Sequence, residues 1–597
     1  MNIESDTIAT IIPRLNNDLF LPAMQRDYVW KVDQIYTLFD SLMQGYPIST
    51  FLFWKAPAAN AKDIERYSFL RTVGVRNNPT TQAELDLHGR RVSFVLDGQQ
   101  RLTSINVGVQ GTYREPNAPR RPPVSKQLFI NVLQDPNAID KNSGHRYHFE
   151  FREVSDSGYI QSTVANQRQY QYWVSVREIF QLRRNHQDQL TEILNRIQTD
   201  YDAQSASPAD TITLAKIKQN TERLYEILFE EKVLAHHTEE TGDAAKMLEI
   251  FIRANNGGTA LKKSDLMLST LTLHWTLSGS ARTAIAGLLR DLNKLIPKRN
   301  VDGEDEEGNK FKIDFVMKAC LVLLDKPVAY NIQSFSSRIC SEICQAWARI
   351  TEALKDTVKL VRSFGITSST LLSVNALMPI AYYLYTNPNN GLAGETDDIR
   401  KVAIKENIRI WLHGALINGI FGGTSDQTIS KLRECLINTG DEFSIEALDR
   451  ETSNLGETPV RDVRTINEIM ALSYQNSEKC FLALAMLYPN AGWIYENYSI
   501  DHLFPQRLFG KHGELAAYIN DSHKIANLCL VSRKNNSRKG AIPMAQWTLQ
   551  QTSEYIDRHL IPQKPELWST NYYNEFTSDR AALLRAKFRE IFKINDA

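Results

Sequence analysis

The chain has 597 residues, which is too long for one hydrophobic core and indicates roughly three to four domains. Its 69 basic and 69 acidic residues give zero formal net charge, which argues against non-specific coating of nucleic acid but allows a local basic cleft. No apolar run approaches the roughly 20 residues that span a bilayer, and the first residues lack the layout of a secretory signal. Since the six cysteines also fit reduced thiols, we predict a cytoplasmic protein that does not bind membranes.

The N-terminal third is predicted to mix short strands with helices. Apolar residues at helical spacing predict a helix over 32–42, and apolar runs predict buried strands at 50–54 and 92–96. The loop 97–100 follows the second strand, and a helix is predicted from Arg101.

Loops and helices make up the predicted middle of the chain. Proline content predicts a surface loop at 114–123, and a second loop is predicted near 203–208. From about residue 243 the pattern is helical, with breaks at the acidic segment 301–308 and at 387–391.

The segment around Asp97 and Gly98 has the geometry of a phosphate-binding loop. A helix that begins after a glycine turn presents free N–H groups and its positive dipole end to an anion. Arg26 and Arg101 could bind phosphate oxygens, and Asp97 could hold a metal ion or a water. The spacing alone is equally typical of an ordinary turn, and no Gly-x-x-x-x-Gly-Lys-Ser/Thr segment exists, which excludes an ordinary P-loop.

Three segments carry a resemblance to a known family: LPAMQRDYVW (21–30), FVLDGQQRLT (94–103) and FIRANNGGTALKKSDL (251–266). They resemble the N-terminal domain of GmrSD-type (Type IV) modification-dependent restriction enzymes, which is related to the ParB/sulfiredoxin fold. The resemblance implies binding and hydrolysis of a nucleoside triphosphate (NTP), with GTP, ATP and UTP all open. It implies these nucleotide-binding residues: Gln25, Arg26, Tyr28, Trp30, Asp97, Gly98, Gln99, Gln100, Arg101 and Asn255.

The pattern changes again near Trp493, where strands are predicted at 493–495 and 528–531. Asp501-His502 at a strand end, an Asn ahead of the second strand and an Asn on the helix beyond it form the layout of a ββα-metal nuclease.

Each residue of this layout has a chemical role. His502 would act as general base on the attacking water, and Asn527 would orient its imidazole. Asp501 and Asn536 would bind one divalent cation, and their oxygen ligands favour Mg²⁺ or Mn²⁺ over zinc. Asn535 adjoins Asn536, so either could be the ligand, although the Asn-Ser-x-Lys pattern favours Asn536.

Basic residues surround this layout. Those expected to contact the DNA backbone are Arg533, Lys534, Arg538 and Lys539. An isolated Asp-His pair is usually structural and such a basic run is usually a solvated loop, but their order and close spacing favour a nuclease. The segment resembles the HNH nuclease domain fused or partnered to GmrSD-type modules, here as a His-Asn-Asn variant.

We therefore predict an α+β multidomain chain: a ParB/sulfiredoxin-like domain (1–240), a largely α-helical domain (241–465) that begins with the Asn-Gly-Gly element near 245–270, and an HNH (ββα-metal) nuclease domain (466–597). The predicted function is an NTP-regulated DNA endonuclease of bacterial anti-phage defence. Sensing of DNA modification follows from the resemblance alone. A nucleotide-dependent DNA-binding switch without cleavage and an RNA-cutting, toxin-like nuclease are the alternatives. The predicted partners are DNA and a nucleotide, and a homodimer stays open because double-strand cutting by a single-site nuclease often requires two copies.

Overall fold

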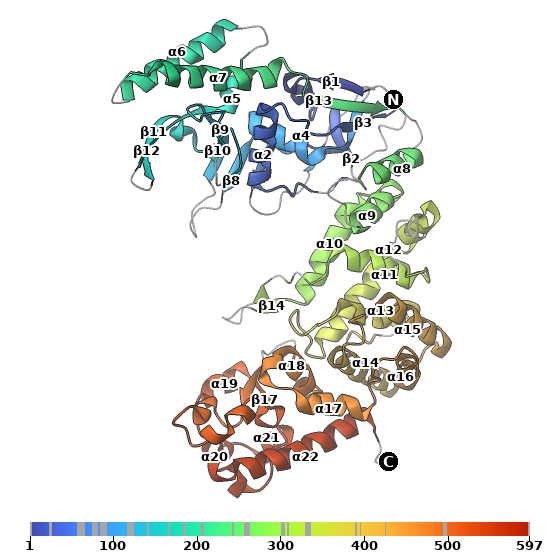
Figure 1. The fold of residues 1–597 in the computed structure, drawn as a ribbon. Coiled ribbons are helices and arrows are strands. Elements are labelled where there is room, and N and C mark those ends of the chain that lie inside the picture. The colour runs from blue at the N-terminus through green and yellow to red at the C-terminus, as the bar shows by residue number, and fades with distance from the viewer. Residues whose placement is uncertain are drawn as a thin grey trace. The chain divides into compact units, whose positions relative to one another are not determined.

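The chain forms two compact units, Met1–Leu273 (unit 1) and His274–Ala597 (unit 2) (Figure 1). The computed structural model describes residues 3–22, 25, 27–56, 66–74, 81–83, 92–115, 124–139, 143–164, 167–182, 187–204, 208–240, 244–255, 263–299, 305–306, 308, 310–328, 336–388, 391–394, 396–423, 425–493 and 498–594. The fold is mixed α/β, with the larger sheets in unit 1 and a mostly helical unit 2. No helix in these ranges is long and apolar enough to cross a membrane.

The described strands of unit 1 form two sheets. The order of the larger sheet, over the described strands, is β1 (Ile3–Asp6), β13 (Leu234–Glu239), β3 (Phe51–Ala56), β7 (Val92–Asp97), β2 (Leu19–Pro22), β4 (Arg66–Ser68) and β6 (Thr81–Gln82). The order of the smaller sheet is β11 (Gly158–Val164), β12 (Gln167–Ser175), β9 (Val124–Asn131), β8 (Thr112–Glu115) and β5 (Thr72–Gly74), with β10 (Phe149–Arg152) also paired to β9. The larger sheet is mixed, since β7 is antiparallel to β3 and parallel to β2.

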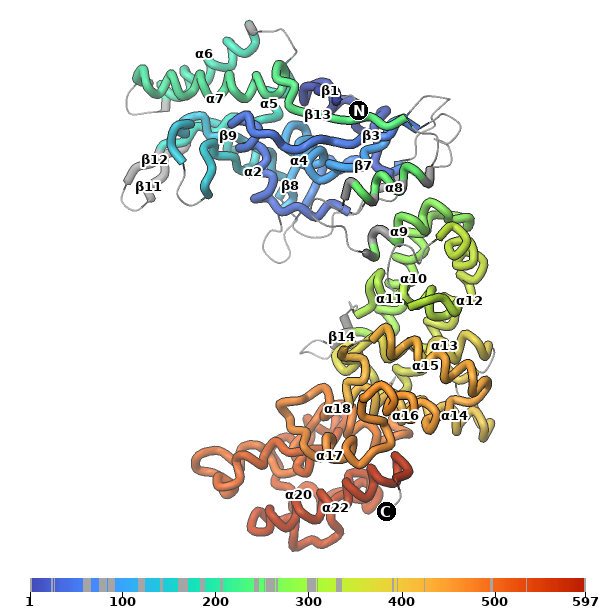
Figure 2. The backbone as a smooth tube through the Cα atoms, turned by 45° about the vertical axis from the view of Figure 1, so that its right-hand side comes forward, coloured from blue at the N-terminus to red at the C-terminus, as the bar shows by residue number. Residues whose placement is uncertain are grey.

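Six helices of unit 1 share one hydrophobic core with these sheets. They are α1 (Ile8–Ile11), α2 (Val32–Met43), α4 (Gln99–Gln110), α5 (Val176–Phe180), α6 (Gln187–Gln204) and α7 (Thr211–Phe229). The described part of unit 1 ends with two further helices, α8 (Ala244–Asn255) and α9 (Lys263–Leu273). Figures 1 and 2 both show α6 lying beside α7. Helix α2 and strand β3 confirm the elements predicted at 32–42 and 50–54.

The turn between β7 and α4 is tighter than the sequence predicts. β7 is an apolar run between two other strands, so it is buried on both faces. Gly98 then adopts a φ of 92°, and a Cβ there would lie 2.2 Å from the ring of Phe51. Only glycine fits this position. The helix predicted from Arg101 is confirmed and begins two residues earlier, at Gln99. The prediction of a loop over 97–100 is wrong, because Asp97 ends β7 and the single left-handed residue Gly98 makes the turn.

Two predicted loops are partly regular structure. The segment predicted as a loop at 114–123 begins with the last two residues of β8, and the loop at 203–208 begins with the last two residues of α6. The backbone hydrogen bonds of β8 and α6 extend two residues into segments whose composition predicts a loop. The remainder of 114–123 lies outside the described residues.

Unit 2 begins as a helical assembly, as predicted for the chain after residue 243. Its helices up to the last strand pair are α10 (Ala281–Leu295), α11 (Ile313–Leu323), α12 (Ser337–Arg362), α13 (Met378–Thr386), α14 (Ile399–Asn418), α15 (Ser425–Thr439), α16 (Ile445–Asn454), α17 (Val463–Ala471) and α18 (Ser477–Ala485). The acidic break carries a short strand, β15 (Asp305–Glu306), paired with β14 (Lys298–Arg299). The break at 387–391 is confirmed, since α13 ends at Thr386.

The last part of unit 2 contains a two-stranded antiparallel sheet. Its elements are β16 (Tyr498–His502), β17 (Leu528–Ser532), α19 (Arg533–Lys539), α20 (Met544–Thr548), α21 (Ser553–Arg558) and α22 (Tyr573–Phe592). β17 confirms the strand predicted at 528–531. The strand predicted at 493–495 is wrong at Trp493, which is a buried turn residue, and the other two positions lie outside the described residues. The predicted domain boundary at 240 falls between β13 and α8 within unit 1, and the one at 465 falls within α17.

Candidate active site

The four residues predicted to form a nuclease site come together around β16, β17 and α19. In the register of the strand pair, Asp501 lies opposite Cys529, and His502 is the last residue of β16. Asn527 directly precedes β17, and Asn536 lies within α19. The order strand end, strand start and following helix is thus the predicted one.

His502 contacts a second histidine that the sequence did not single out. Its Nε2 lies 3.1 Å from Nδ1 of His523, and the ring of Tyr474 packs against both imidazoles, at centroid distances of 5.2 and 5.8 Å. Burial, and secondly the neighbouring His523, lower the pKa of His502 to about 4. The imidazole is therefore neutral at neutral pH, which is the state in which it can accept a proton.

Asn527 holds the backbone near the histidines. Its buried amide donates to the carbonyls of Ser522 (2.8 Å) and Phe504 (3.3 Å) and accepts from the N–H of Phe504 (2.9 Å). The backbone N–H of Leu503 also donates to the Asn527 carbonyl at 2.8 Å. These bonds fix the chain just after His502, so Asn527 contacts the backbone rather than the imidazole it was predicted to orient.

Arg580, on α22, donates hydrogen bonds to the backbone around Asn527. The side chain is completely buried, and burial lowers the pKa of its guanidinium. It donates to the carbonyls of Ile525, Ala526, Leu528 and His559, at 2.7–3.3 Å. Five donated bonds satisfy a buried cation that would otherwise be strongly unfavourable. The sequence pattern gave no signal for Arg580, which lies far along the chain from the strands it supports.

Lys539 pairs with Asp501. Its ammonium lies 2.5 Å from Asp501 Oδ2 and 2.5 Å from the carbonyl of His502, and its side chain is only 1% exposed. The prediction that Lys539 contacts the DNA backbone is therefore wrong, because its charge faces inward. Lys534 and Arg538, on the same helix, are exposed, whereas the side chain of Arg533 lies outside the described part.

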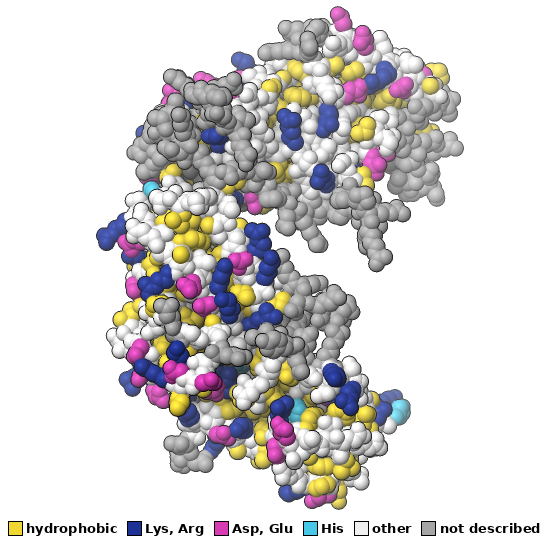
Figure 3. Space-filling view, turned by 180° about the vertical axis from the view of Figure 1, so that it is seen from behind, with side chains coloured by type: hydrophobic (Ala, Val, Ile, Leu, Met, Phe, Trp, Pro, Cys, Tyr) yellow, Lys and Arg dark blue, Asp and Glu magenta, His cyan; other side chains and the backbone are white. Residues whose placement is uncertain are grey.

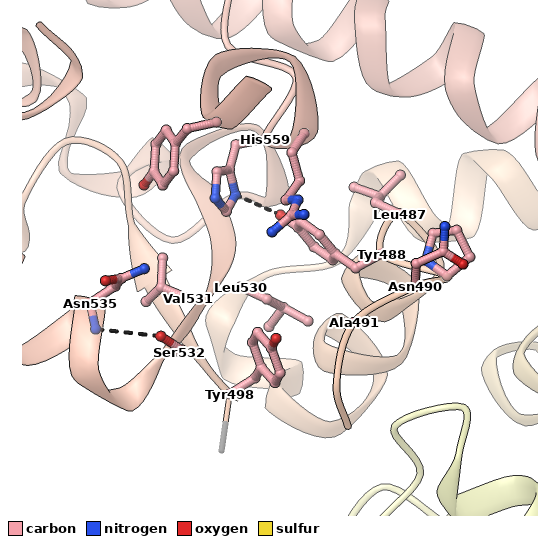
Figure 4. A pocket seen from close by; sticks show the side chains of 13 residues that line it. Leu487, Tyr488, Asn490, Ala491, Tyr498, Leu530, Val531, Ser532, Asn535 and His559 are labelled. Carbon is pink, nitrogen blue, oxygen red and sulfur yellow. Dashed lines mark hydrogen bonds between the residues drawn. The ribbon is translucent and has the colours of Figure 1, made fainter. Parts of the chain in front are cut away.

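The two candidate ligand asparagines differ in their surroundings. Asn536 Nδ2 donates to Ser499 Oγ at 3.0 Å, and Ser499 shares a face of β16 with Asp501 because side chains alternate along a strand. Asn535 instead lines a pocket of about 200 Å³, together with Tyr498 and His559 (Figure 4). The contact with Ser499 favours Asn536 as the partner of Asp501.

The donor types of Asp501 and Asn536 agree with the predicted hard cation, which stays a prediction. Asp501 Oδ1 and the amide oxygen of Asn536 are the donor types that Mg²⁺ and Mn²⁺ prefer, while Lys539 occupies Oδ2. Clusters of three or more His, Cys, Asp or Glu able to hold a metal are absent from the described residues.

The segment around Gln25 is brought together with β7 and α4 in unit 1. Gln25 is buried and donates to the carbonyls of Val95 and Leu96, at 3.0 and 2.7 Å. The Tyr28 hydroxyl lies 2.8 Å from Ser104 Oγ, and burial raises the pKa of Tyr28 to about 12. Two of the sequence segments that carry the family resemblance are thus in direct contact.

Gln100 makes further contacts between the same two segments. Its side chain accepts from the N–H of Val29 at 2.9 Å and donates to the carbonyl of Asp27 at 3.2 Å. Gln99 is buried, and Trp30 packs partly buried against the core. Arg26 and the side chain of Asn255 lie outside the described residues, although Asn255 itself ends α8.

Arg101 points back into the protein. Its guanidinium donates to the carbonyls of Ile48 (2.5 Å) and Thr50 (3.3 Å), pairs with Asp97 at 3.2 Å and lies 4.7 Å from the ring centroid of Phe51. Burial lowers the pKa of Arg101. These contacts hold the turn at Gly98, and a phosphate contact by Arg101 stays a prediction.

Residues 8–272 match the family model described as GmrSD restriction endonuclease, N-terminal domain. Unit 1 is similar to the GmrSD N-terminal domain. The matched region ends one residue before the end of unit 1, so it contains α8 and all of α9 except Leu273. The match indicates a restriction endonuclease of phage defence, with DNA as substrate. No curated protein matches the chain.

Proposed function

We propose that this protein is an HNH-type DNA endonuclease of phage defence, regulated by an NTP that unit 1 binds. The observation that carries the proposal is the position of His502 at the end of β16, next to Asp501, with the backbone that follows it fixed by Asn527. The GmrSD match over residues 8–272 supports the biological setting.

Hydrolysis by such a site needs a base, a cation and a positioned phosphate. His502 takes a proton from the attacking water, and the backbone bonds of Asn527 hold the loop that carries it. Asp501 and Asn536 would hold Mg²⁺ or Mn²⁺, which stabilises negative charge on the phosphate and the leaving oxygen when bound. Lys534 and Arg538, both exposed on α19, would contact the DNA backbone.

The surface charge fits local rather than general contact with DNA. On the face seen in Figure 3, basic and acidic side chains are interspersed, in agreement with zero formal net charge. Specificity for modified DNA is part of the proposal through the family alone.

Cleavage is tested with plasmid and phage DNA, modified and unmodified, incubated with Mg²⁺ and each NTP in turn. Wild-type protein is expected to nick or cut at least one substrate, and His502→Ala to lose about 10²–10⁴-fold in rate. His512→Ala is the matched control, because that histidine is exposed in the same part of the chain. DNA that stays intact under all conditions, or a His502→Ala variant as active as wild type, would refute the proposal. A parallel RNA substrate separates DNA from RNA cleavage.

The nucleotide half is tested by phosphate release from ATP, GTP and UTP. Asp97→Ala and Arg101→Ala should abolish turnover, because Asp97 and Arg101 pair across the turn at Gly98. Cleavage chemistry at His502 should survive both changes. Turnover that persists in both variants would show that this turn is not the nucleotide site.

A further inference from the structure

The contact between His502 and His523 joins two rings that can each be either donor or acceptor. A neutral imidazole carries one N–H and one lone pair, so a single hydrogen bond between two such rings selects a tautomer for both. The 3.1 Å contact joins Nε2 of His502 to Nδ1 of His523. Nδ1 of His502 therefore stays outside this contact.

The chemistry of a general base decides between the two arrangements. If His523 donated, the proton of His502 would sit on Nδ1, and both of its nitrogens would be engaged or protonated. If His502 donates from Nε2, the lone pair on Nδ1 is free to take a proton from water. Only the second arrangement makes His502 a base, and it requires the Nδ1 lone pair of His523 as acceptor.

His523 is fixed in place as firmly as His502. The Asn527 amide that binds Phe504, two residues after His502, also donates to the carbonyl of Ser522, directly before His523. On the other side, the N–H of Tyr474 donates to the His523 carbonyl at 2.8 Å. One buried amide thus sets the positions of both histidines, while the Tyr474 ring packs against both imidazoles.

We propose that His523 is the positioning residue of the nuclease site: it accepts the Nε2 proton of His502 and so presents the Nδ1 lone pair to the attacking water. This inference rests on the proposed nuclease function. During hydrolysis the water oxygen bonds to phosphorus as its proton passes to His502 Nδ1. The bond from phosphorus to the leaving oxygen breaks, and that oxygen takes a proton from solvent. The imidazolium so formed keeps its Nε2–H donated to His523, a charge-assisted bond that stabilises it.

The test compares His523→Ala with His523→Asn in the full-length protein. Asparagine places an amide oxygen near the position of Nδ1 and can accept the same hydrogen bond. We expect His523→Ala to lower kcat about 10–100-fold, the range for groups that orient a reacting residue, with KM for DNA and melting temperature unchanged. His523→Asn should recover most of the rate, and His512→Ala should match wild type. A wild-type rate in His523→Ala, or an equal loss in both His523 variants, would overturn the proposal.

A second measurement does not depend on cleavage. Long-range ¹H–¹⁵N correlation spectra of histidine-labelled protein, assigned by comparison with His502→Ala, report which nitrogen of His502 carries the proton. The proposal expects Nε2–H in wild type and in His523→Asn, and loss of that preference in His523→Ala. An Nδ1–H tautomer in wild type would overturn the positioning role. By contrast, DNA left intact by wild type and by His502→Ala alike would overturn the nuclease function itself.

Discussion

Replacing Lys539 with methionine should destabilise unit 2 far more than it weakens DNA binding. The ammonium is buried against Asp501 Oδ2 and the His502 carbonyl, and the Asp501 side chain is only 14% exposed. Methionine keeps most of the side-chain volume but leaves the carboxylate without its counter-ion. Breaking a buried ion pair in this way costs about 3–5 kcal/mol.

That free energy corresponds to a large shift in melting temperature. Each kcal/mol lowers the midpoint by about 2–4 °C in domains of 150–250 residues, so we expect a drop of roughly 6–20 °C. Because unit 2 is longer than that range, the lower end applies. Asp501→Asn combined with Lys539→Met removes both charges and should recover part of the loss, and the recovered fraction measures the coupling of the pair.

Two measurements distinguish a basic residue that stabilises the fold from one that binds DNA. They are scanning calorimetry of the full-length protein and DNA affinity over a series of salt concentrations. Lys534→Met and Arg538→Met on the same helix are the controls. Being exposed, they should change stability by no more than about 0.5 kcal/mol, yet each should reduce the salt dependence of DNA binding by about one counter-ion. If Lys539→Met melted like wild type and weakened DNA binding as Lys534→Met does, the ammonium would face the DNA and our assignment would be refuted.

Three further predictions concern other parts of the molecule. Gly98→Ala should lower the free energy of unfolding of unit 1 by about 2–6 kcal/mol, because the strain of a positive φ and the clash with the Phe51 ring add. Gly419 has a φ of 71° and open space around it, so Gly419→Ala should cost only the backbone strain of about 1–3 kcal/mol. Equal urea midpoints for the two variants would contradict this. Burial lowers the pKa of His413 to about 4 and of His559 to about 3, below the unfolded value near 6.5. Their contribution to stability is therefore full above pH 6.5 and is lost as the pH falls, by about 2 kcal/mol per histidine between pH 7 and 5. A urea midpoint that stays constant over that range would argue against this prediction. Chelation by EDTA should abolish DNA cleavage and added Mg²⁺ or Mn²⁺ should restore it, so cleavage that persists in EDTA would exclude the proposed cation.

Local patterns predicted those elements whose structure follows from their own residues. The helix at 32–42 has apolar side chains at helical spacing, and the strand at 92–96 is apolar except for Ser93, so each segment indicates its own structure. The strand at 498–502 does not, because Tyr-Ser-Ile-Asp-His is half polar and becomes a strand by pairing with β17. Trp493 looked like strand, yet it packs in a turn against Gly365, where a Cβ would come within 2.8 Å of its ring.

Spacing along the chain placed the main site residues in the correct elements, but not their partners. The charged run after β17 resembles a solvated segment, and only its packing against β16 shows that Lys539 faces Asp501. The acceptors of Arg101, the carbonyls of Ile48 and Thr50, come from a distant segment, so the spacing around Gly98 could not show them. His523 was missed for a similar reason, since its contact with His502 depends on the fold of the loop before Asn527.

The dependence of the loop at Asn527 on Arg580 has a consequence for synthesis of the protein. All the proposed reacting groups precede α22, yet the carbonyls on both sides of Asn527 obtain their donors from that helix. During synthesis on the ribosome, His502, His523, Asn527 and Asn536 therefore emerge before Arg580 can bind the carbonyls of the loop at Asn527. We expect cleaving ability to arise only once α22 has emerged, which delays exposure of the host chromosome to an active nuclease.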